Sequence, residues 1–221
     1  MGNDEASRSS SVLQHRSLPE QVHEILRLRI LNNELPAGAP LAEVPLAAEF
    51  GVSRTTIRSA MRELQAERLI EVSPRRGSTV SRMSDSDIWE VCYARYVLEA
   101  AAYNDALPGN RERLVADIEI ALARMESAAR SGDTAGVILA DTDLHRAVMI
   151  AAGHPVLLDL WESLNGQMGA LMRSDLDRQG IGLDETVGKH ERLLSVVREH
   201  GADEVIAALR LHYLDPGRGD S

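Results

Sequence analysis

The chain has 221 residues, of which 44% are hydrophobic, and it carries a formal net charge of -10. This length allows one large domain or two modest ones, each with a real core. Aromatic residues make up only 3%, which argues against a stacking platform for single-stranded nucleic acid, and the single cysteine excludes a disulfide framework or a thiolate zinc cluster. The polar N-terminus has no apolar signal segment, and no run approaches the roughly 18 apolar residues of a membrane span. We therefore expect a soluble, cytoplasmic protein with no membrane partner.

The charge is unevenly distributed along the chain. Residues 1–83 contain 11 Lys and Arg against 10 Asp and Glu, whereas the remainder contains 13 against 24. Such an asymmetry indicates that the first part of the chain contacts a polyanion and the second part does not.

Residues 1–16 are predicted to be a disordered tail, and residues 17–83 to form a first domain. Ser17 and Glu20 provide a capping box for its first helix, and the stretch ELPAGAP (34–40) ends that helix. A second short helix is predicted over 42–50 and a third, capped by Ser53, over about 53–67. Two strands follow over 69–72 and 78–81, joined by a basic turn.

Residues 84–221 are predicted to form an all-α domain. Helical periodicity and helix-stop signals place six helices there. They are expected at about 85–106, 111–130, 134–152, 156–174, 185–200 and 203–214. The predicted fold class is therefore mostly α, with an N-terminal winged helix-turn-helix and a C-terminal bundle of about six helices.

The third helix has the pattern of a DNA-reading helix. Two helices joined by a tight turn at Gly51 and followed by a hairpin wing form a winged helix-turn-helix, whose second helix enters the major groove. Arg54, Thr55 and Arg58 lie largely off its apolar face, where arginine can pair with guanine and threonine can contact a phosphate or a thymine methyl group. A solvated basic face is the alternative, but the capped turn, the wing and the local positive charge together favour DNA. The residues predicted from the helix and the wing are Arg54, Thr55, Thr56, Arg58, Arg62, Arg75 and Arg76.

Four polar side chains in the second half lie on apolar helix faces. Asp141 and His145 are four residues apart and share a face with Ile138, Val148 and Met149, and His190 and His212 occupy similar positions on two later helices. A single buried histidine is usually structural. Four buried polar groups each need a partner, however, and one divalent metal ion satisfies them all. Without thiolate ligands such a set suits Zn, Ni, Mn or Fe, and the sequence does not choose among them.

The stretch LAEVPLAAEFGVSRTTIRSAMRELQAERLIEVSPRRGSTV (41–80) resembles the DNA-binding domain of the GntR family of bacterial transcription regulators. The resemblance implies DNA contacts from the recognition helix and from Gly77 and its neighbours in the wing. Three positions depart from the family pattern: Ala42 replaces a usual capping serine, Ser59 a usual glutamate, and Arg68 a usual helix-ending glycine. We expect a weakened cap at the first and a strained or rearranged turn at the last.

The resemblance continues into the helical half. The stretches ARYVLEAAA (94–102) and DTDLH (141–145), together with His190 and His212, resemble the FCD ligand-binding domain of the FadR-like GntR subfamily. In its metal-binding members an aspartate and three histidines hold the ion, and they map onto Asp141, His145, His190 and His212. The resemblance also implies that Arg95 faces the effector pocket. His154 stands where asparagine is frequent, so a contact at the pocket rim is expected to differ.

These observations favour a homodimeric transcription regulator, not an enzyme, that binds a palindromic DNA operator and is controlled by a small carboxylate effector at a metal site. Two alternatives remain from the sequence. A metal-dependent hydrolase uses a similar ligand set, although no second acid is placed as an obvious general base. A DNA-binding protein whose metal is purely structural would need no effector.

Overall fold

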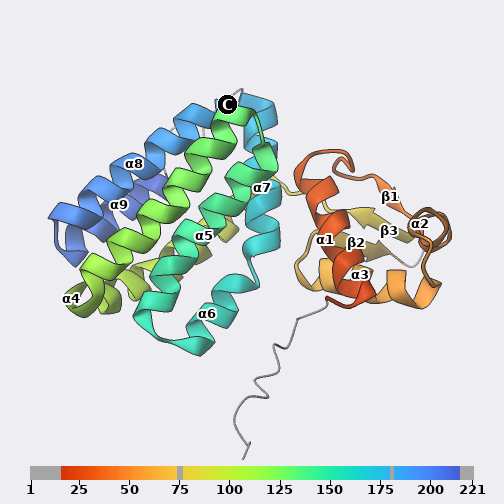
Figure 1. Cartoon of the computed structure of the whole chain (residues 1–221), viewed down its shortest axis with the longest axis horizontal. Coiled ribbons are helices and arrows are strands. Elements are labelled where there is room, and N and C mark those ends of the chain that lie inside the picture. The colour runs from red at the N-terminus through yellow and green to blue at the C-terminus, as the bar shows by residue number, and fades with distance from the viewer. Residues whose placement is uncertain (1–15, 74–76, 180–181, 215–221) are drawn as a thin grey trace, which may run out of the picture.

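The computed structural model describes residues 16–73, 77–179 and 182–214, and the side chains of 85 and 174–179 are not described. The predicted tail, apart from Arg16, and the predicted wing residues Arg75 and Arg76 lie outside these ranges. Figure 1 shows two bodies between which the chain passes from β3 to α4, with a small sheet and α1 to α3 in the first and α4 to α9 in the second. Every helix that the structure describes is too short or too polar to span a bilayer.

The first body is built as the local signals predict, with one additional strand. It contains α1 (Leu18–Leu31), β1 (Pro40–Leu41), α2 (Glu43–Phe50), α3 (Arg54–Ala66), β2 (Ile70–Ser73) and β3 (Gly77–Val80). The three strands form an antiparallel sheet in the order β1-β3-β2. Strand β1 was not predicted, because two residues are too short to carry a periodicity and they lie inside a stretch of helix-breaking residues.

The ends of these helices follow the expected capping chemistry. The Ser17 and Glu20 side chains each accept a hydrogen bond from the other's backbone N–H, which closes the capping box. Ser53 Oγ accepts from the Thr56 N–H at 3.1 Å at the start of α3. Ala42 makes no side-chain cap at α2, and Arg68 has a φ of 56°, so both expected departures are present.

Helix α3 is held in place through one face. Ile57, Ala60, Met61 and Leu64 are buried against α1 and the sheet. Because the apolar residues all lie on this face, the arginines of α3 remain on the outer side, as its strong amphipathic pattern predicts. The predicted winged helix-turn-helix is confirmed.

The second body is dominated by one long helix, α4 (Asp85–Ser131), where two helices were predicted. The break predicted at LPGN is wrong, since Pro108 lies inside α4. An interior proline costs about 3 kcal/mol because it removes a backbone hydrogen bond and crowds the preceding turn. Leu107 and Leu114, on either side, are buried in the same core, and Arg111 donates to the carbonyl of Val197 on α8, so packing on both sides favours continuing the helix.

A second correction concerns the segment predicted as one helix over 156–174. The structure has α6 (Pro155–Glu162) and α7 (Asn165–Gln179) instead. Ser163 Oγ donates to the carbonyl of Leu160 at 2.7 Å, which satisfies one of the last carbonyls of α6. The break carries no proline and no glycine before Gly166, so the sequence gives no stop signal there.

The other helices of the second body lie close to their predicted ranges. They are α5 (Thr134–Ala152), α8 (Leu183–Glu199) and α9 (Ala202–Leu214). Helix α4 runs along α5, α8 and α9 (Figure 1). The buried faces of α5, α8 and α9 turn towards the interior that these four helices enclose, and Asp141, His145, His190 and His212 lie on those faces.

Candidate metal centre and nucleic-acid interface

The side chains of α3 that are predicted to contact DNA lie along the outer face of this helix. Arg54, Thr55, Arg58 and Arg62 are exposed, and Thr56 is half-buried with its hydroxyl 2.8 Å from that of Ser53. Gly77 is exposed at the start of β3 with a φ of 73°, a left-handed conformation that favours glycine.

A glutamate that sequence reasoning did not single out holds two of these arginines. Glu43, in the first turn of α2, accepts from Arg58 Nε at 2.9 Å and from Arg58 Nη2 at 2.8 Å, and it accepts from Arg54 Nη2 at 3.3 Å. These bonds, chiefly those from Arg58, lower the pKa of Glu43 to about 2. The arginines therefore point in a direction fixed by a neighbouring carboxylate before any DNA is bound.

Helices α5, α8 and α9 bring the four predicted metal ligands together. Asp141, His145, His190 and His212 each offer a ligand atom, and these atoms all lie within 4.8 Å of one another. His212 is half-buried, and the other three side chains are buried. Within the described ranges this is the group of histidine and acidic side chains that is suited to hold a metal ion.

The surroundings of two histidines fix which nitrogen faces the centre of the cluster. His190 Nδ1 lies 2.8 Å from the backbone carbonyl of Thr186, which can only accept, so Nδ1 carries the hydrogen. His145 Nδ1 lies 2.7 Å from Glu99 Oε2 and is oriented in the same way. The lone pairs of neutral rings are therefore on Nε2, and the two Nε2 atoms face each other at 3.3 Å.

When both rings are neutral, the centre of the cluster contains electron pairs without matching donors. Asp141 Oδ1 lies 2.8 Å from His190 Nε2 and 3.9 Å from His145 Nε2. Burial raises the pKa of Asp141, but a hydrogen bond from the protonated form of His190 and the positive charge of Arg95 hold it below its usual range. The buried Asp141 carboxylate and the Nε2 atoms of His145 and His190 face the same point, and each of these two rings is oriented by a hydrogen bond at its Nδ1. Such an arrangement fits a divalent cation.

Glu99, on α4, connects the cluster to Arg95, and sequence reasoning gave it no role. Its Oε1 accepts from Arg95 Nε at 3.0 Å, from Trp161 Nε1 at 2.6 Å and from Tyr213 Oη at 2.8 Å. Its Oε2 holds His145, as described above. Burial opposes ionisation, yet the charge of Arg95 and the hydrogen bonds from His145 and Trp161 keep the pKa of Glu99 below its usual range. The one available signal was its spacing of four residues from Arg95 within ARYVLEAAA.

Arg95 is fully buried, with 0% of its surface exposed. Its Nη1 donates to Asn165 Oδ1 at 2.7 Å, and its guanidinium carbon lies 3.8 Å from the centre of the Trp161 ring. In the part of the chain that the structure describes, its Nη2 has no hydrogen-bond partner. A buried charged N–H without an acceptor is costly and therefore suggests that a ligand supplies one.

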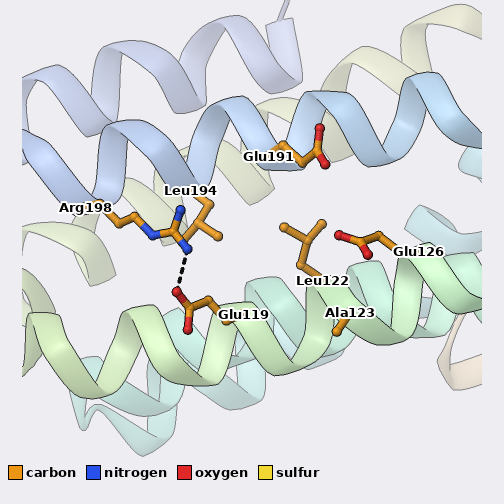
Figure 2. Close-up of a pocket in the computed structure, with 7 residues that line it drawn as sticks. All are labelled: Glu119, Leu122, Ala123, Glu126, Glu191, Leu194 and Arg198. Carbon is orange, nitrogen blue, oxygen red and sulfur yellow. Dashed lines mark hydrogen bonds and ion pairs between the residues drawn. The ribbon is translucent and has the colours of Figure 1, made fainter.

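A separate groove of about 360 Å³ lies between α4 and α8 (Figure 2). None of its lining residues belongs to the histidine cluster or to the Arg95 network. Its one arginine, Arg198, is paired with Glu119, while Glu126 and Glu191 add negative charge. This groove is therefore poorly suited to an anionic ligand. The full lining is Glu119, Leu122, Ala123, Glu126, Glu191, Leu194 and Arg198.

Comparison with known proteins gives matches to both halves of the chain. Residues 18–80 match the bacterial regulatory proteins of the gntR family, and residues 90–215 match the FCD domain. A probable D-xylose utilization operon transcriptional repressor from Paenarthrobacter nicotinovorans is 28% identical over 93% of this chain and 89% of the relative. A gluconate operon transcriptional repressor from Bacillus licheniformis is 26% identical over 86% of this chain and 79% of the relative.

The same fold occurs in a solved structure, described as a putative transcriptional regulator GntR from Rhodococcus sp. RHA1. It has a TM-score of 0.77 and 23% identity, and the match covers 89% of this chain and 94% of that one. The matched families and relatives are transcription regulators, so they agree with a protein that is not an enzyme and give no support to the hydrolase alternative.

Proposed function

Because this chain belongs to the GntR family of bacterial regulatory proteins and carries an FCD domain, we propose that it is a cytoplasmic transcription regulator controlled by a small carboxylate at a metal centre. In this proposal the first body binds a palindromic operator, and the second body binds the metal and the effector and forms a homodimer.

The DNA contacts are assigned to α3 and the wing. Arg54, Arg58 and Arg62 are exposed on one side of a helix whose other side is buried, and Thr55 is exposed beside them. In this proposal Arg54, Thr55, Thr56 and Arg58 contact base edges and adjacent phosphates, and Arg62 and Gly77 contact the DNA backbone. Arg75 and Arg76 follow the phosphates or enter the minor groove.

The metal is assigned to Asp141, His145, His190 and His212. The inward-facing Nε2 atoms of His145 and His190 beside the Asp141 carboxylate support this assignment, because a divalent cation would match all their electron pairs at once. The nitrogen and oxygen donor set fits Zn, Ni, Mn or Fe. When bound, the ion would supply a positively charged, Lewis-acidic position for an oxygen of the effector.

One observation carries the effector assignment, namely the buried Nη2 of Arg95 that lacks an acceptor. Arg95 is linked through Glu99 to His145, so it belongs to the same buried network as the proposed metal ligands. A carboxylate oxygen would satisfy Nη2 and neutralise the guanidinium. The gluconate operon controlled by the Bacillus licheniformis relative suggests sugar acids as a class to test first.

The homodimer is assigned to the second body. Trp89, Tyr93 and Val97 follow one another at four-residue spacing on α4, and all three are exposed, Trp89 at 57%. The Trp89 and Tyr93 rings are stacked with their centroids 5.0 Å apart. An exposed stripe of large apolar and aromatic side chains is typical of a protein interface, and a dimer presents two recognition helices to the halves of a palindrome.

Calorimetry and DNA binding on the full-length protein test this function together. A panel of hydroxy, keto and sugar acids, including D-gluconate, is titrated into metal-loaded protein, and an operator recovered from a random duplex pool is titrated with and without each acid. We expect one acid to bind and to change operator affinity by about 5–150-fold, the usual range for coupled sites.

Two variants separate effector control from a purely structural metal. Arg95→Lys keeps a buried positive charge but lacks the second terminal nitrogen, so it should retain metal and lose the acid. His190→Ala should lose metal and the response to acid while still binding DNA. An acid that binds Arg95→Lys or metal-free protein as tightly as it binds the wild type would refute the effector site. If no acid changes the DNA affinity of metal-loaded protein, the purely structural metal is favoured.

A further inference from the structure

The first turn of α7 touches both the effector network and the end of the recognition helix. Asn165, which is buried, accepts from Arg95 Nη1 through Oδ1 at 2.7 Å. The next residue, Gly166, lies against the end of α3: a Cβ added there would lie 2.5 Å from the backbone oxygen of Glu67 and 3.1 Å from Leu69 Cγ. The consecutive residues Asn165 and Gly166 therefore connect the Arg95 network directly to the end of the recognition helix α3.

The contact continues along one face of α7. A Cβ added at Gly169 would lie 2.9 Å from Leu31 Cδ2 of α1, and Ala170 packs against the core of the first body. These residues and Gly166 have the spacing of one helix face, and their small side chains allow close approach of the backbones. Figure 1 shows α7 on the side of the second body that faces α1, and α1 packs against both α5 and α7.

The end of α3 is firmly attached where Gly166 meets it. Glu67, the C-terminal capping residue of α3, lies 2.6 Å from His23 Nε2 and accepts from Arg27 Nε at 3.2 Å, both on α1. Arg68 follows in the left-handed conformation. Since close-packed interiors transmit small displacements, a shift of Gly166 would move α3 and α1 together instead of being absorbed.

We propose that Asn165 is the positioning residue that reports occupancy of the effector site to the recognition helix, acting through Gly166. This inference rests on the proposed function. Arg95 Nε is occupied by Glu99, so a carboxylate that binds in the two-pronged manner must use Nη1 and Nη2. Such an acid binds Nη1 beside Asn165 and draws the guanidinium towards itself, and the resulting change in the bond from Nη1 to Asn165 lets the first turn of α7 move.

This connection between the effector site and the DNA-binding body differs from the one that the order of the helices in the sequence suggests. Helix α4 follows the first body directly in the chain and carries Arg95, so it is the obvious connection. Yet in the second body it is α5 and α7 that pack closely on α1, and α7 carries both Asn165, which binds Arg95, and Gly166, which meets the end of α3. The proposal therefore predicts that changes in α7 alter coupling without removing a ligand of the metal or the charge of Arg95.

The first experiment needs no identified effector and uses full-length protein with its selected operator. Gly166→Ala pushes a methyl group against the carbonyl of Glu67, so it should weaken operator binding at least about fivefold, the lower end of typical coupling. Gly109→Ala on α4 is the matched control, because a Cβ there meets nothing within 4 Å, and it should change binding less than about twofold. Gly166→Ala should also speed amide hydrogen exchange at residues 67–69 but not across the second body. Operator affinity equal to that of the wild type would overturn the proposal.

A double-mutant cycle then tests Asn165 itself. Arg95→Lys should change operator affinity in the wild-type background and should have no further effect in Asn165→Ala, because the link is already broken. Effects that simply add would refute the role of Asn165. With D-gluconate as the probe, or any acid that the calorimetric panel identifies, Asn165→Ala should still bind acid but change operator affinity less than about twofold on binding it. A wild-type protein that binds neither duplex DNA nor any acid of the panel would instead count against the proposed function.

Discussion

Replacing Glu99 with glutamine keeps the shape of the side chain but removes its charge and one of its acceptors. Arg95 Nε, Trp161 Nε1 and Tyr213 Oη all donate to Oε1, so the amide oxygen of the variant must occupy that position. The amide nitrogen then faces His145 Nδ1, where Glu99 Oε2 lies at 2.7 Å. Two donors cannot face each other, so His145 is forced to carry its hydrogen on Nε2 and can no longer offer a lone pair to a metal ion.

Two effects follow from this rearrangement. Partners that orient a metal-binding histidine are usually worth about 10–100-fold in metal affinity, or about 1.4–2.7 kcal/mol. In addition, Arg95 loses the carboxylate that pairs with it. Breaking a buried pair costs about 3–5 kcal/mol, and about 2–4 °C of melting temperature per kcal/mol is expected for a chain of this length. The remaining bond to Asn165 places Glu99→Gln at the lower end of that range.

Competition between the protein and a chelator for Zn²⁺ or Ni²⁺ measures the first effect, and thermal unfolding of the metal-free protein measures the second. Glu90→Gln is the matched control, since Glu90 is exposed on the same helix. If Glu99→Gln binds metal within about twofold of the wild type while remaining folded, the inferred orientation of His145 is wrong.

Three further predictions concern the DNA-binding surface, pH and assembly. Glu43→Gln removes the carboxylate that accepts two hydrogen bonds from Arg58, so Arg58 becomes available to a phosphate. Fluorescence anisotropy should then show tighter binding to random-sequence duplex, and the slope of log affinity against log salt concentration should be steeper by about one. Unchanged non-specific binding would contradict this. The hydrogen bond that His23 donates to the Glu67 carboxylate raises the pKa of His23. Protonated His23 therefore stabilises the fold fully below the unfolded-state pKa of about 6.5, and this stabilisation is lost as pH rises through the higher folded-state pKa. The difference in urea unfolding between wild type and His23→Gln should therefore shrink from pH 6 to pH 8, and a difference that grows would refute the pairing. Trp89→Ser should dissociate the dimer at micromolar concentration in sedimentation velocity, whereas a wild-type monomer would remove the basis of the dimer assignment.

Much of the first body could be predicted because its signals are local. Ser17 with Glu20, and Ser53 after Gly51, are capping and turn residues whose effect depends on neighbours within a few positions. The strand β1 could not be predicted, because its two residues become a strand only by pairing with β3.

The helix boundaries of the second body illustrate the opposite case. Pro108 is a strong local signal for a break, yet buried contacts before and after it keep α4 continuous. Helix α6 ends at Glu162 without a proline or glycine, and α7 begins at Asn165, whose side chain accepts from Arg95. In both places tertiary packing outweighs the local helix preference, so the sequence around Pro108 and around Ser163 does not predict where the helices end.

By itself the sequence determined which side chains turn inwards. Helical spacing places Asp141, His145, His190 and His212 on apolar faces, and those faces must be buried. Only the tertiary structure decided that the four meet within 4.8 Å, that Glu99 stands behind His145, and that α7 is the helix lying between Arg95 and the recognition helix. The physical reason is that periodicity fixes the direction of a side chain around its own helix, whereas the distance between residues on different helices depends on how the helices pack.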